Sequence, residues 1–193
     1  HFAWSLYFKM LQPPIPFNVL SNRGMPIDRA RCDLVGQAKA CNASHIFFLD
    51  SDVILPPDGL IRLFNHRLPI VAGLYGSKHN CADVWIETSK SGTQRYAPVA
   101  YEHLERTPLF THPSLVTGGG CCLIDMKVFD ALKEPYFLWT QGREASGISE
   151  DFYFCEKVRE AGIPIHIDTT IRCYHADIGA CLDSKGTWGR LPA

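Results

Sequence analysis

The short run HIFFL at residues 45–49 ends directly at Asp50-Ser51-Asp52, and this junction constrains the fold more than any other segment. Five residues are too few for a stable helix, and the run indicates a buried strand. A helix is predicted before it, from Pro26 to about Cys41, and a β-favouring run at residues 15–20 precedes that helix. A right-handed crossover makes the two strands of such a unit parallel. The loops after them then lie at one sheet edge, where open α/β sheets bind ligands.

The alternation of short strands and helices continues along the chain. We therefore expect an α/β fold in a single domain, with a mixed, mostly parallel central sheet flanked by helices. The further expected elements are helices at 2–11 and 59–66, a strand at 70–75, a hairpin of VWIET and QRYAPVAY broken by Ser91-Gly92, a strand at 115–125 interrupted by three glycines, helices at 126–132 and 150–161, and a last strand at 163–175.

Charge and hydropathy exclude several classes of protein. The 193 residues carry a formal net charge of -1, so the chain lacks the overall positive charge that general nucleic-acid binding uses. No apolar run approaches the roughly 20 residues that span a bilayer, and the first residues lack the pattern of a signal peptide. We expect no nucleic-acid partner, no membrane span and a cytoplasmic location.

The eight cysteines are predicted to be buried thiols. They lie in apolar, well-patterned segments that can form a core without disulfides, and no CxxC pair provides the spacing of a zinc site. In a source whose intracellular proteins are oxidised, Cys155, Cys173 and Cys181 would be the candidates for disulfides.

Asp50 and Asp52 are candidates for a metal site because they directly follow a buried strand. In a simple turn, their side chains would instead cap the following helix. At the ligand-binding edge of a sheet, carboxylate oxygens suit Mg²⁺ or Mn²⁺, and such a cation can hold a diphosphate. We favour the metal and phosphate interpretation.

A second acidic pair, Glu150-Asp151, follows Ser149 at the start of the predicted helix 150–161. Serine at the N-cap with acidic residues in the first turn is ordinary helix stabilisation. A functional role is favoured by the glycine- and aromatic-rich segment 134–149, which resembles a mobile loop, and by His175, a candidate third metal ligand at the end of a later strand.

Four segments, in this order, resemble nucleotide-sugar-dependent glycosyltransferases of the GT-A fold, close to the inverting glycosyltransferase family 2 and to small archaeal, phage and viral members. They are Ala30-Arg31-Cys32, similar to an Ala-Arg-Asn element; FFLDSDVILPPDGLIRL, similar to the DxD strand and the following helix; GGGCCLIDMKVFDAL, similar to the acceptor-side strand and helix; and SEDFYFCEKVREAG, similar to the ED motif. The chain departs from the pattern by Cys32 in place of Asn and by starting at what resembles the helix after the family's first strand. The resemblance implies a Rossmann-like GT-A domain with a nucleotide-binding half at about 1–75 and an acceptor-binding half at about 76–193.

The resemblance implies a metal and a donor site in the first half. Asp52, with Asp50 directly or through water, and His175 would hold Mn²⁺ or Mg²⁺ across the diphosphate of a nucleotide-diphosphate sugar. Asp50 could alternatively face the ribose or the donor sugar.

Further donor contacts are implied by the same resemblance. Arg31 would lie near the diphosphate or the base, whereas Arg29 fits a solvated helix face better. Ser21 and Asn22 would contact the nucleoside, with an ordinary turn as their alternative.

The resemblance also implies how the acceptor is activated. Asp151 would act as general base on an acceptor hydroxyl that attacks the anomeric carbon with inversion, and Glu150 would support it by hydrogen bonding. The segment Gly118-Gly119-Gly120, with Gly119 and Gly120 on the acceptor side, would let the backbone approach the donor sugar or would form a bulge. Trp139 would stack on a sugar ring or pack in the core.

We therefore expect metal-dependent transfer of a sugar from a nucleotide-diphosphate sugar to a hydroxyl of a glycan, protein or small molecule; for a viral chain this would occur in the host cytoplasm. A metal-dependent nucleotidyltransferase also uses clustered carboxylates, but the chain has no GxxxxGK[ST] loop. A nucleotide-sugar-binding module or an inactive glycosyltransferase-like protein is the non-enzymatic alternative, and it would tolerate replacement of Asp151.

Overall fold

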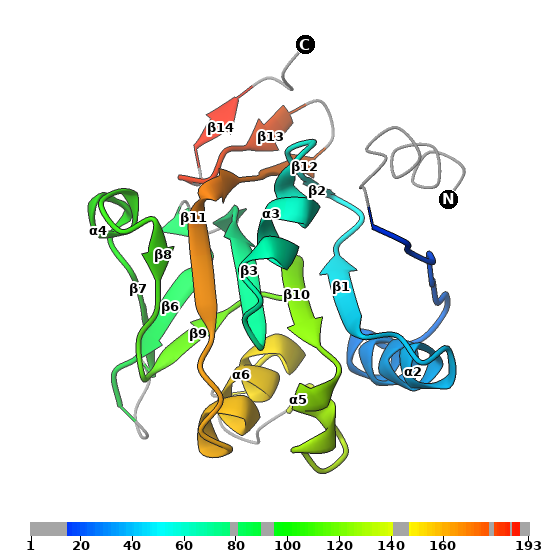
Figure 1. Cartoon of the computed structure of the whole chain (residues 1–193). Helices are drawn as coiled ribbons and strands as arrows, with labels where there is room; N and C mark the ends of the chain where they lie inside the picture. Colours follow the sequence, from blue (N-terminus) through cyan, green and yellow to red (C-terminus); the bar gives the residue numbers. More distant parts are fainter. Residues whose placement is uncertain are drawn as a thin grey trace.

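A five-stranded mixed sheet forms the centre of the protein (Figure 1). The computed structural model describes residues 15–77, 81–89, 95–140, 147–177, 180–185 and 187–189. The strand order in the central sheet is β1 (His45–Leu49), β10 (Cys121–Asp125), β3 (Ile70–Leu74), β11 (His166–Arg172) and β8 (Leu109–Phe110).

The directions of these strands decide what reaches each edge of the sheet. β3 and β11 pair in parallel, and β10 lies antiparallel between β1 and β3. β8 closes the other side, antiparallel to β11. β1, β3 and β11 therefore point the same way, as expected for strands that end at one ligand-binding edge. The mixed sheet is confirmed, but it is less parallel than predicted because β10 inserts antiparallel between two of these strands.

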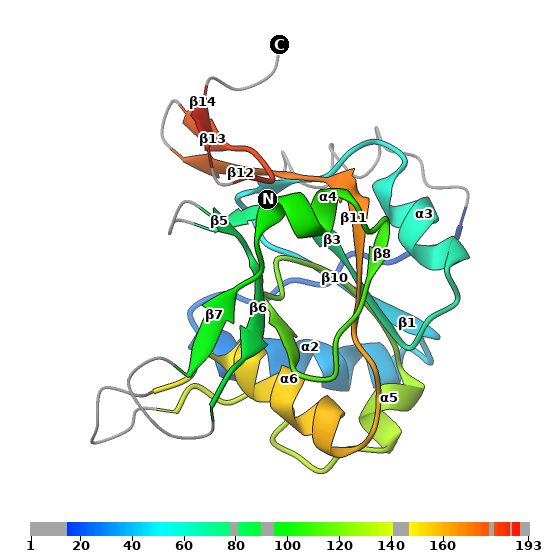
Figure 2. The ribbon, with the colours of Figure 1, turned by 90° about the vertical axis from the view of Figure 1, so that its left-hand side faces the viewer.

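Helices cover both faces of the central sheet (Figure 2). α2 (Ile27–Ala40) and α6 (Glu150–Glu160) pack on one face, and α3 (Gly59–Asn65) packs on the other. Alternation along β10 supplies both cores: Cys122 and Ile124 join the α2 and α6 side, whereas Cys121 and Leu123 join the α3 side. None of the described helices is long and apolar enough to cross a membrane.

Smaller sheets flank the central one. A three-stranded sheet contains β7 (Tyr96–Pro98), β6 (Val84–Glu87) and β9 (Leu115–Thr117). The antiparallel pairing of β6 with β7 confirms the predicted hairpin, although Ser91-Gly92 lies outside the described residues. The predicted strand at 115–125 is divided, because β9 belongs to this sheet and β10 to the central one.

The remaining short elements form two further small sheets and two short helices. They are β2 (Val53–Ile54), β12 (Tyr174–Asp177), β13 (Ala180–Leu182) and β14 (Trp188–Gly189) in one sheet, β4 (Gly76–Ser77) and β5 (Cys81–Ala82) in another, and the helices α4 (Tyr101–Glu105) and α5 (Lys127–Asp130).

The predicted strand at residues 15–20 is wrong. This segment forms no helix or strand and joins no sheet in the part of the chain that the structure describes. Pro16 has no N–H to donate to a strand ladder, and Pro16 to Val19 are exposed. The predicted strand–helix–strand unit therefore does not form. The helix predicted at 2–11 lies outside the described residues.

The cysteines agree with the prediction only in part. Cys121, Cys122, Cys155 and Cys173 are buried free thiols, whereas Cys41 is exposed. Burial raises the pKa of the Cys122 thiol to about 12. The sulfur of Cys173 lies 3.7 Å from that of Cys121, in contact but not bonded. The side chain of Cys181 lies outside the described part.

Candidate functional site

Three strands that point the same way bring polar residues to one edge of the central sheet. Asp50 follows β1, Tyr75 follows β3, and His175 lies in β12 immediately beyond β11. Because β10 runs in the opposite direction, the segment Gly118-Gly119-Gly120 arrives at the same edge just before that strand begins. The Asp50 N–H donates to the Gly120 carbonyl at 3.0 Å. This hydrogen bond joins the end of β1 to the glycine segment before β10.

Arg31, from α2, is buried at the centre of a cluster of polar groups. Its Nη2 lies 3.2 Å from Asp50 Oδ1 and its Nε lies 3.2 Å from Glu150 Oε1. Its Nη1 donates to the Gly119 carbonyl at 3.2 Å, and the Gly119 N–H donates to Asp151 Oδ2 at 3.2 Å. We call Arg31, Asp50, Gly119, Glu150 and Asp151 the Arg31 cluster. It unites residues from all four segments on which the sequence analysis rested.

The Arg31 cluster holds more negative than positive charge. Burial disfavours the charge of Arg31, but the carboxylates of Asp50, Asp151 and Glu150 outweigh burial and raise its pKa. Burial raises the pKa of both Asp50 and Glu150, and Arg31 only partly offsets this effect. One guanidinium thus faces three carboxylates, and the excess negative charge favours an approaching cation.

The position of Arg31 differs from the predicted one, in which Arg31 lies near the diphosphate or the base of the donor. Arg31 is only 4% exposed, and its guanidinium lies 5.3 Å from the ring centroid of Phe48 and 5.9 Å from that of Phe137. A guanidinium enclosed in this way organises the surrounding carboxylates and the Gly119 backbone. Contact with a donor stays a prediction for Arg31, while Arg29 is exposed, as a solvated helix face requires.

Asp52 and His175 form a second, more accessible part of the site. His175 Nε2 lies 3.1 Å from Asp52 Oδ2, and His175 Nδ1 lies 2.9 Å from the Gly76 carbonyl oxygen. The Asp52 side chain is 43% exposed. Both of these partners are hydrogen-bond acceptors, so a neutral imidazole, which has one N–H, can donate to only one of them.

The predicted three-residue ligand set of Asp50, Asp52 and His175 is not assembled. Among the described residues, no group of three or more His, Cys, Asp or Glu side chains is arranged to hold a metal ion. Asp50 is turned to Arg31, which leaves Asp52 and His175 as the two neighbouring candidates.

The Asp52–His175 pair nevertheless fits a divalent cation. A histidine whose Nδ1–H is fixed by a backbone carbonyl has its Nε2 oriented for metal binding. Mg²⁺ commonly takes only one or two protein ligands and completes its shell with water and substrate phosphates. The pair offers one carboxylate and one imidazole for such a site.

The three glycines lie close to the site's own side chains, and Gly118 and Gly119 leave no room for a Cβ unless a neighbouring side chain shifts. A Cβ on Gly118 would lie 2.1 Å from Asp83 Oδ2, and one on Gly119 would lie 2.0 Å from Arg31 Nη1. A Cβ on Gly120 would lie 3.1 Å from Asp50 Oδ2. The close approach observed here is to protein side chains; an approach to a donor sugar stays a prediction.

Two site residues were missed by the sequence analysis. The Tyr75 hydroxyl accepts the Gly120 N–H at 3.1 Å and is hydrogen-bonded to Asp83, whose Oδ1 accepts Trp85 Nε1–H at 2.8 Å. Tyr75 stands directly after a buried strand at the ligand edge. The same positional signal singled out Asp50, so it could have identified Tyr75.

The helix-stabilising alternative is realised in part, because Glu150 and Asp151 lie in the first turn of α6, but the side-chain caps of α3 and α6 do not form. Ser149 occupies the N-cap of α6 but makes no side-chain cap; its hydroxyl binds Asp151 Oδ1 instead. Asp58 is the N-cap of α3, and Asp50 and Asp52 are directed to Arg31 and His175. The acidic side chains are therefore held within the site.

The predicted nucleoside contacts lie beside α2. The Asn22 side-chain amide donates to Asp33 Oδ2 at 2.6 Å and to the Ala30 carbonyl, so it is held against the helix. Ser21, its neighbour in the chain, is exposed.

Trp139 lies at the start of α2, on the surface. Trp139 is 52% exposed, and its backbone N–H donates to Asp28 Oδ2 at 3.2 Å. The core-packing alternative is therefore wrong. Stacking against a sugar remains a prediction.

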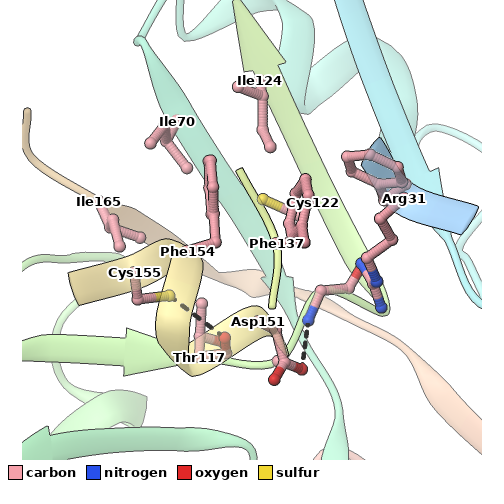
Figure 3. Close-up of a pocket in the computed structure, with 13 residues that line it drawn as sticks. Arg31, Ile70, Thr117, Cys122, Ile124, Phe137, Asp151, Phe154, Cys155 and Ile165 are labelled. Carbon is pink, nitrogen blue, oxygen red and sulfur yellow. Dashed lines mark hydrogen bonds between the residues drawn. The ribbon is translucent and has the colours of Figure 1, made fainter. Parts of the chain in front are cut away.

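An apolar pocket adjoins the Arg31 cluster (Figure 3). The rings of Phe137 and Phe154 stack in it with centroids 4.7 Å apart, and Arg31 and Asp151 also line it. Such a lining does not suit a charged diphosphate. Its effect is to keep the Arg31 cluster in low-dielectric surroundings.

Comparison with known proteins supports the fold. No protein-family model matches the sequence, and no curated protein matches it. Among solved structures, the chain is similar to A197 from STIV, with a TM-score of 0.64 and 18% sequence identity over 97% of this chain and 87% of that chain. This likeness shows a shared fold.

Proposed function

We propose that the chain is a metal-dependent glycosyltransferase that moves a sugar from a nucleotide-diphosphate sugar to an acceptor hydroxyl with inversion. The observation that carries this proposal is the meeting of two parts at one sheet edge. The Arg31 cluster presents Asp151, and the Asp52–His175 pair offers ligands for a divalent cation.

Asp151 is the proposed general base. Its Oδ2 accepts the Gly119 N–H, and its Oδ1 binds the Ser149 hydroxyl, so the carboxylate is fixed in orientation. It would take the proton of the acceptor hydroxyl as that oxygen bonds to the anomeric carbon and the bond from this carbon to the diphosphate breaks. Glu150 would act indirectly, by holding Arg31.

The Asp52–His175 pair is the proposed donor side of the site. A bound Mn²⁺ or Mg²⁺ would supply positive charge to the departing nucleoside diphosphate. Asp52 and His175 would hold it, and the Gly76 carbonyl would fix the orientation of the His175 ring. Trp139 and the Gly118-Gly119-Gly120 segment are the proposed acceptor-side contacts.

Thermal unfolding with nucleotides and metal tests the donor proposal. UDP, GDP, CMP, dTDP and their sugars would be compared with and without Mn²⁺. A ligand at about 100 times its Kd adds roughly 2.7 kcal/mol, which should raise the Tm for one nucleotide only when Mn²⁺ is present. Asp52→Ala should lose this rise, with Asp58→Ala, at the exposed start of α3, as the matched control.

A binding module would give the same rise in Tm without turnover. Turnover distinguishes the two hypotheses. If the chain is a transferase, the wild type transfers sugar, and Asp151→Asn should keep the nucleotide-dependent rise in Tm but lose this transfer. If no nucleotide raises the Tm in the presence of Mn²⁺ or Mg²⁺, the proposed donor class is wrong.

A further inference from the structure

We propose that Tyr75 and Asp83 are positioning residues that hold the backbone beneath the general base and join the two parts of the site. The inference rests on the proposed function and extends it to two residues outside the four recognised segments. Neither residue is proposed to contact the reacting atoms.

The first step of the argument is a chain of hydrogen bonds. Trp85 Nε1–H donates to Asp83 Oδ1 at 2.8 Å, and the Tyr75 hydroxyl is hydrogen-bonded to Asp83. Because the Asp83 carboxylate accepts, the Tyr75 hydroxyl donates its proton there and offers its oxygen elsewhere. That oxygen accepts the Gly120 N–H at 3.1 Å, in a buried position.

The second step is the position of Gly119, next to this anchored residue. Its N–H holds Asp151 and its carbonyl accepts Arg31 Nη1. The Gly119 carbonyl shares a peptide unit with the anchored Gly120 N–H, and the Gly119 N–H belongs to the preceding unit. Tyr75 therefore acts on the base through the two peptide units that meet at Gly119, without touching it.

The third step is the contact of Tyr75 with the metal side. Its ring packs edge-on against the His175 ring, with centroids 5.9 Å apart. Asp83 N–H donates to the Tyr75 carbonyl at 2.9 Å, so the two residues are also linked through the backbone. Tyr75 thus contacts His175 on one side and the glycine segment on the other.

The space around these groups leaves little room for adjustment. A Cβ on Gly118 would meet both Asp83 Oδ2 and Tyr75 Oη at 2.1 Å. Burial raises the pKa of Asp83, and the nearby Asp151 charge raises it further, against the hydrogen bonds from Trp85 and Tyr75. The glycine segment is therefore seated on the Tyr75–Asp83 pair, and its position follows theirs.

The test compares Tyr75→Phe and Asp83→Asn with Tyr96→Phe. Tyr75→Phe removes only the hydroxyl, and Asp83→Asn places an amide where the Tyr75 proton needs an acceptor. Tyr96 also bonds a carboxylate, Glu156, but on the outer sheet. Each variant is measured for nucleotide-sugar turnover with Mn²⁺, for the nucleotide-dependent rise in Tm, and for amide hydrogen exchange in the peptide covering 115–125.

We expect kcat to fall by up to about 100-fold in Tyr75→Phe, as for a misplaced catalytic group, and less in Asp83→Asn. The nucleotide-dependent rise in Tm should persist in both variants. The amides of the glycine segment should exchange faster, and the KM for the nucleotide sugar should stay near the wild-type value while kcat falls. A loss of folded protein alone would lower the measured rate without faster exchange confined to residues 118–120.

The proposal is overturned if Tyr75→Phe keeps the wild-type rate and the wild-type exchange of the glycine segment. If the wild-type protein transfers no sugar, the proposed function fails, and hydrogen exchange still decides the positioning role. Unchanged exchange in Tyr75→Phe would then refute it, and faster exchange confined to residues 118–120 would support it.

Discussion

The Arg31 cluster and the Asp52–His175 pair lie at the same sheet edge but are built in opposite ways. Arg31 and Glu150 are 4% and 3% exposed, and they form an ion pair with each other inside the protein. The Asp52 side chain is 43% exposed, and the His175 ring faces two acceptors. The first part is held together by the fold, whereas the second is suited to a cation from outside. A site can therefore separate the groups that stabilise it from the groups that bind ligand.

The largest effect on stability should come from Arg31→Met. This change keeps a long side chain but removes the only cation of the Arg31 cluster, so Asp50 and Glu150 are left without their partner. Breaking a buried ion pair on one side costs about 3–5 kcal/mol, which urea unfolding would measure. Arg29→Met, at an exposed position of the same helix, is the control. A wild-type urea midpoint for Arg31→Met would show that the cluster is not stabilised by its cation.

A smaller loss is expected for Gly119→Ala. The new Cβ would lie 2.0 Å from Arg31 Nη1, and relief of such overpacking costs about 1–3 kcal/mol. Gly36→Ala is the matched control, because a Cβ there meets nothing within 4 Å and α2 gains a better helix former. The two variants should therefore change the free energy of unfolding in opposite directions. Equal and small changes would mean that the glycine segment is not packed against Arg31.

The pH dependence of stability should distinguish carboxylates of the site from one outside it. The pKa of Asp83 is raised above 3.8, so the folded state holds its proton longer and the stability that Asp83 contributes falls as pH rises through this range. The difference in free energy of unfolding between Asp83→Asn and the wild type should accordingly shift in favour of the variant as pH rises from about 4 to the raised pKa. Unfolding in urea at a series of pH values measures this difference.

Asp168 provides the opposite case. Although burial opposes its charge, hydrogen bonds from His66 and Thr170 and the charge of Arg62 lower its pKa below 3.8. The stability that it contributes is present above pH 3.8 and is lost as pH falls through the lowered pKa, so Asp168→Asn should cost most at neutral pH. The same sign of pH dependence for both variants would contradict the electrostatic difference between the two positions.

The smallest effect on stability should come from Asp52→Asn. Because the Asp52 side chain is 43% exposed, its interaction with His175 should contribute less than about 1 kcal/mol. The same change should remove the Mn²⁺-dependent rise in Tm with nucleotide. A large loss of stability with retained metal dependence would reverse the distinction between the two parts of the site.

Much of the fold could be predicted because local pattern and burial agree. The run at 45–49 forms β1, and the helices predicted at Pro26 to about Cys41 and at 150–161 correspond to α2 and α6. α6 ends where Gly162 adopts a φ of +72°, which glycine tolerates. The failures concern pairing between distant segments: residues 15–20 have β propensity but find no strand partner, and the antiparallel insertion of β10 has no local signal.

The site was predicted by residue type more successfully than by contact. The sequence pattern predicted Asp50, Glu150 and Asp151 as site residues, but it did not predict that Arg31 would be buried among them. Burial of a charged residue depends on neighbours that are distant in the chain, and a single helix pattern does not reveal them. Tyr75 was missed although its position directly after a buried strand can be read from the sequence; only its contact with Gly120, 45 residues away, required the structure.

We propose that Asp151 acts as a base on a donor held by Asp52, His175 and a divalent cation. The most direct measurement is release of nucleotide from the nucleotide sugar that gives the largest Mn²⁺-dependent rise in Tm, with wild-type protein and Asp151→Asn in parallel. We predict release by the wild type, and a rate lower by about 10²- to 10⁴-fold in Asp151→Asn with donor binding retained. Equal rates for the two proteins, or donor binding without any release by the wild type, would contradict the account.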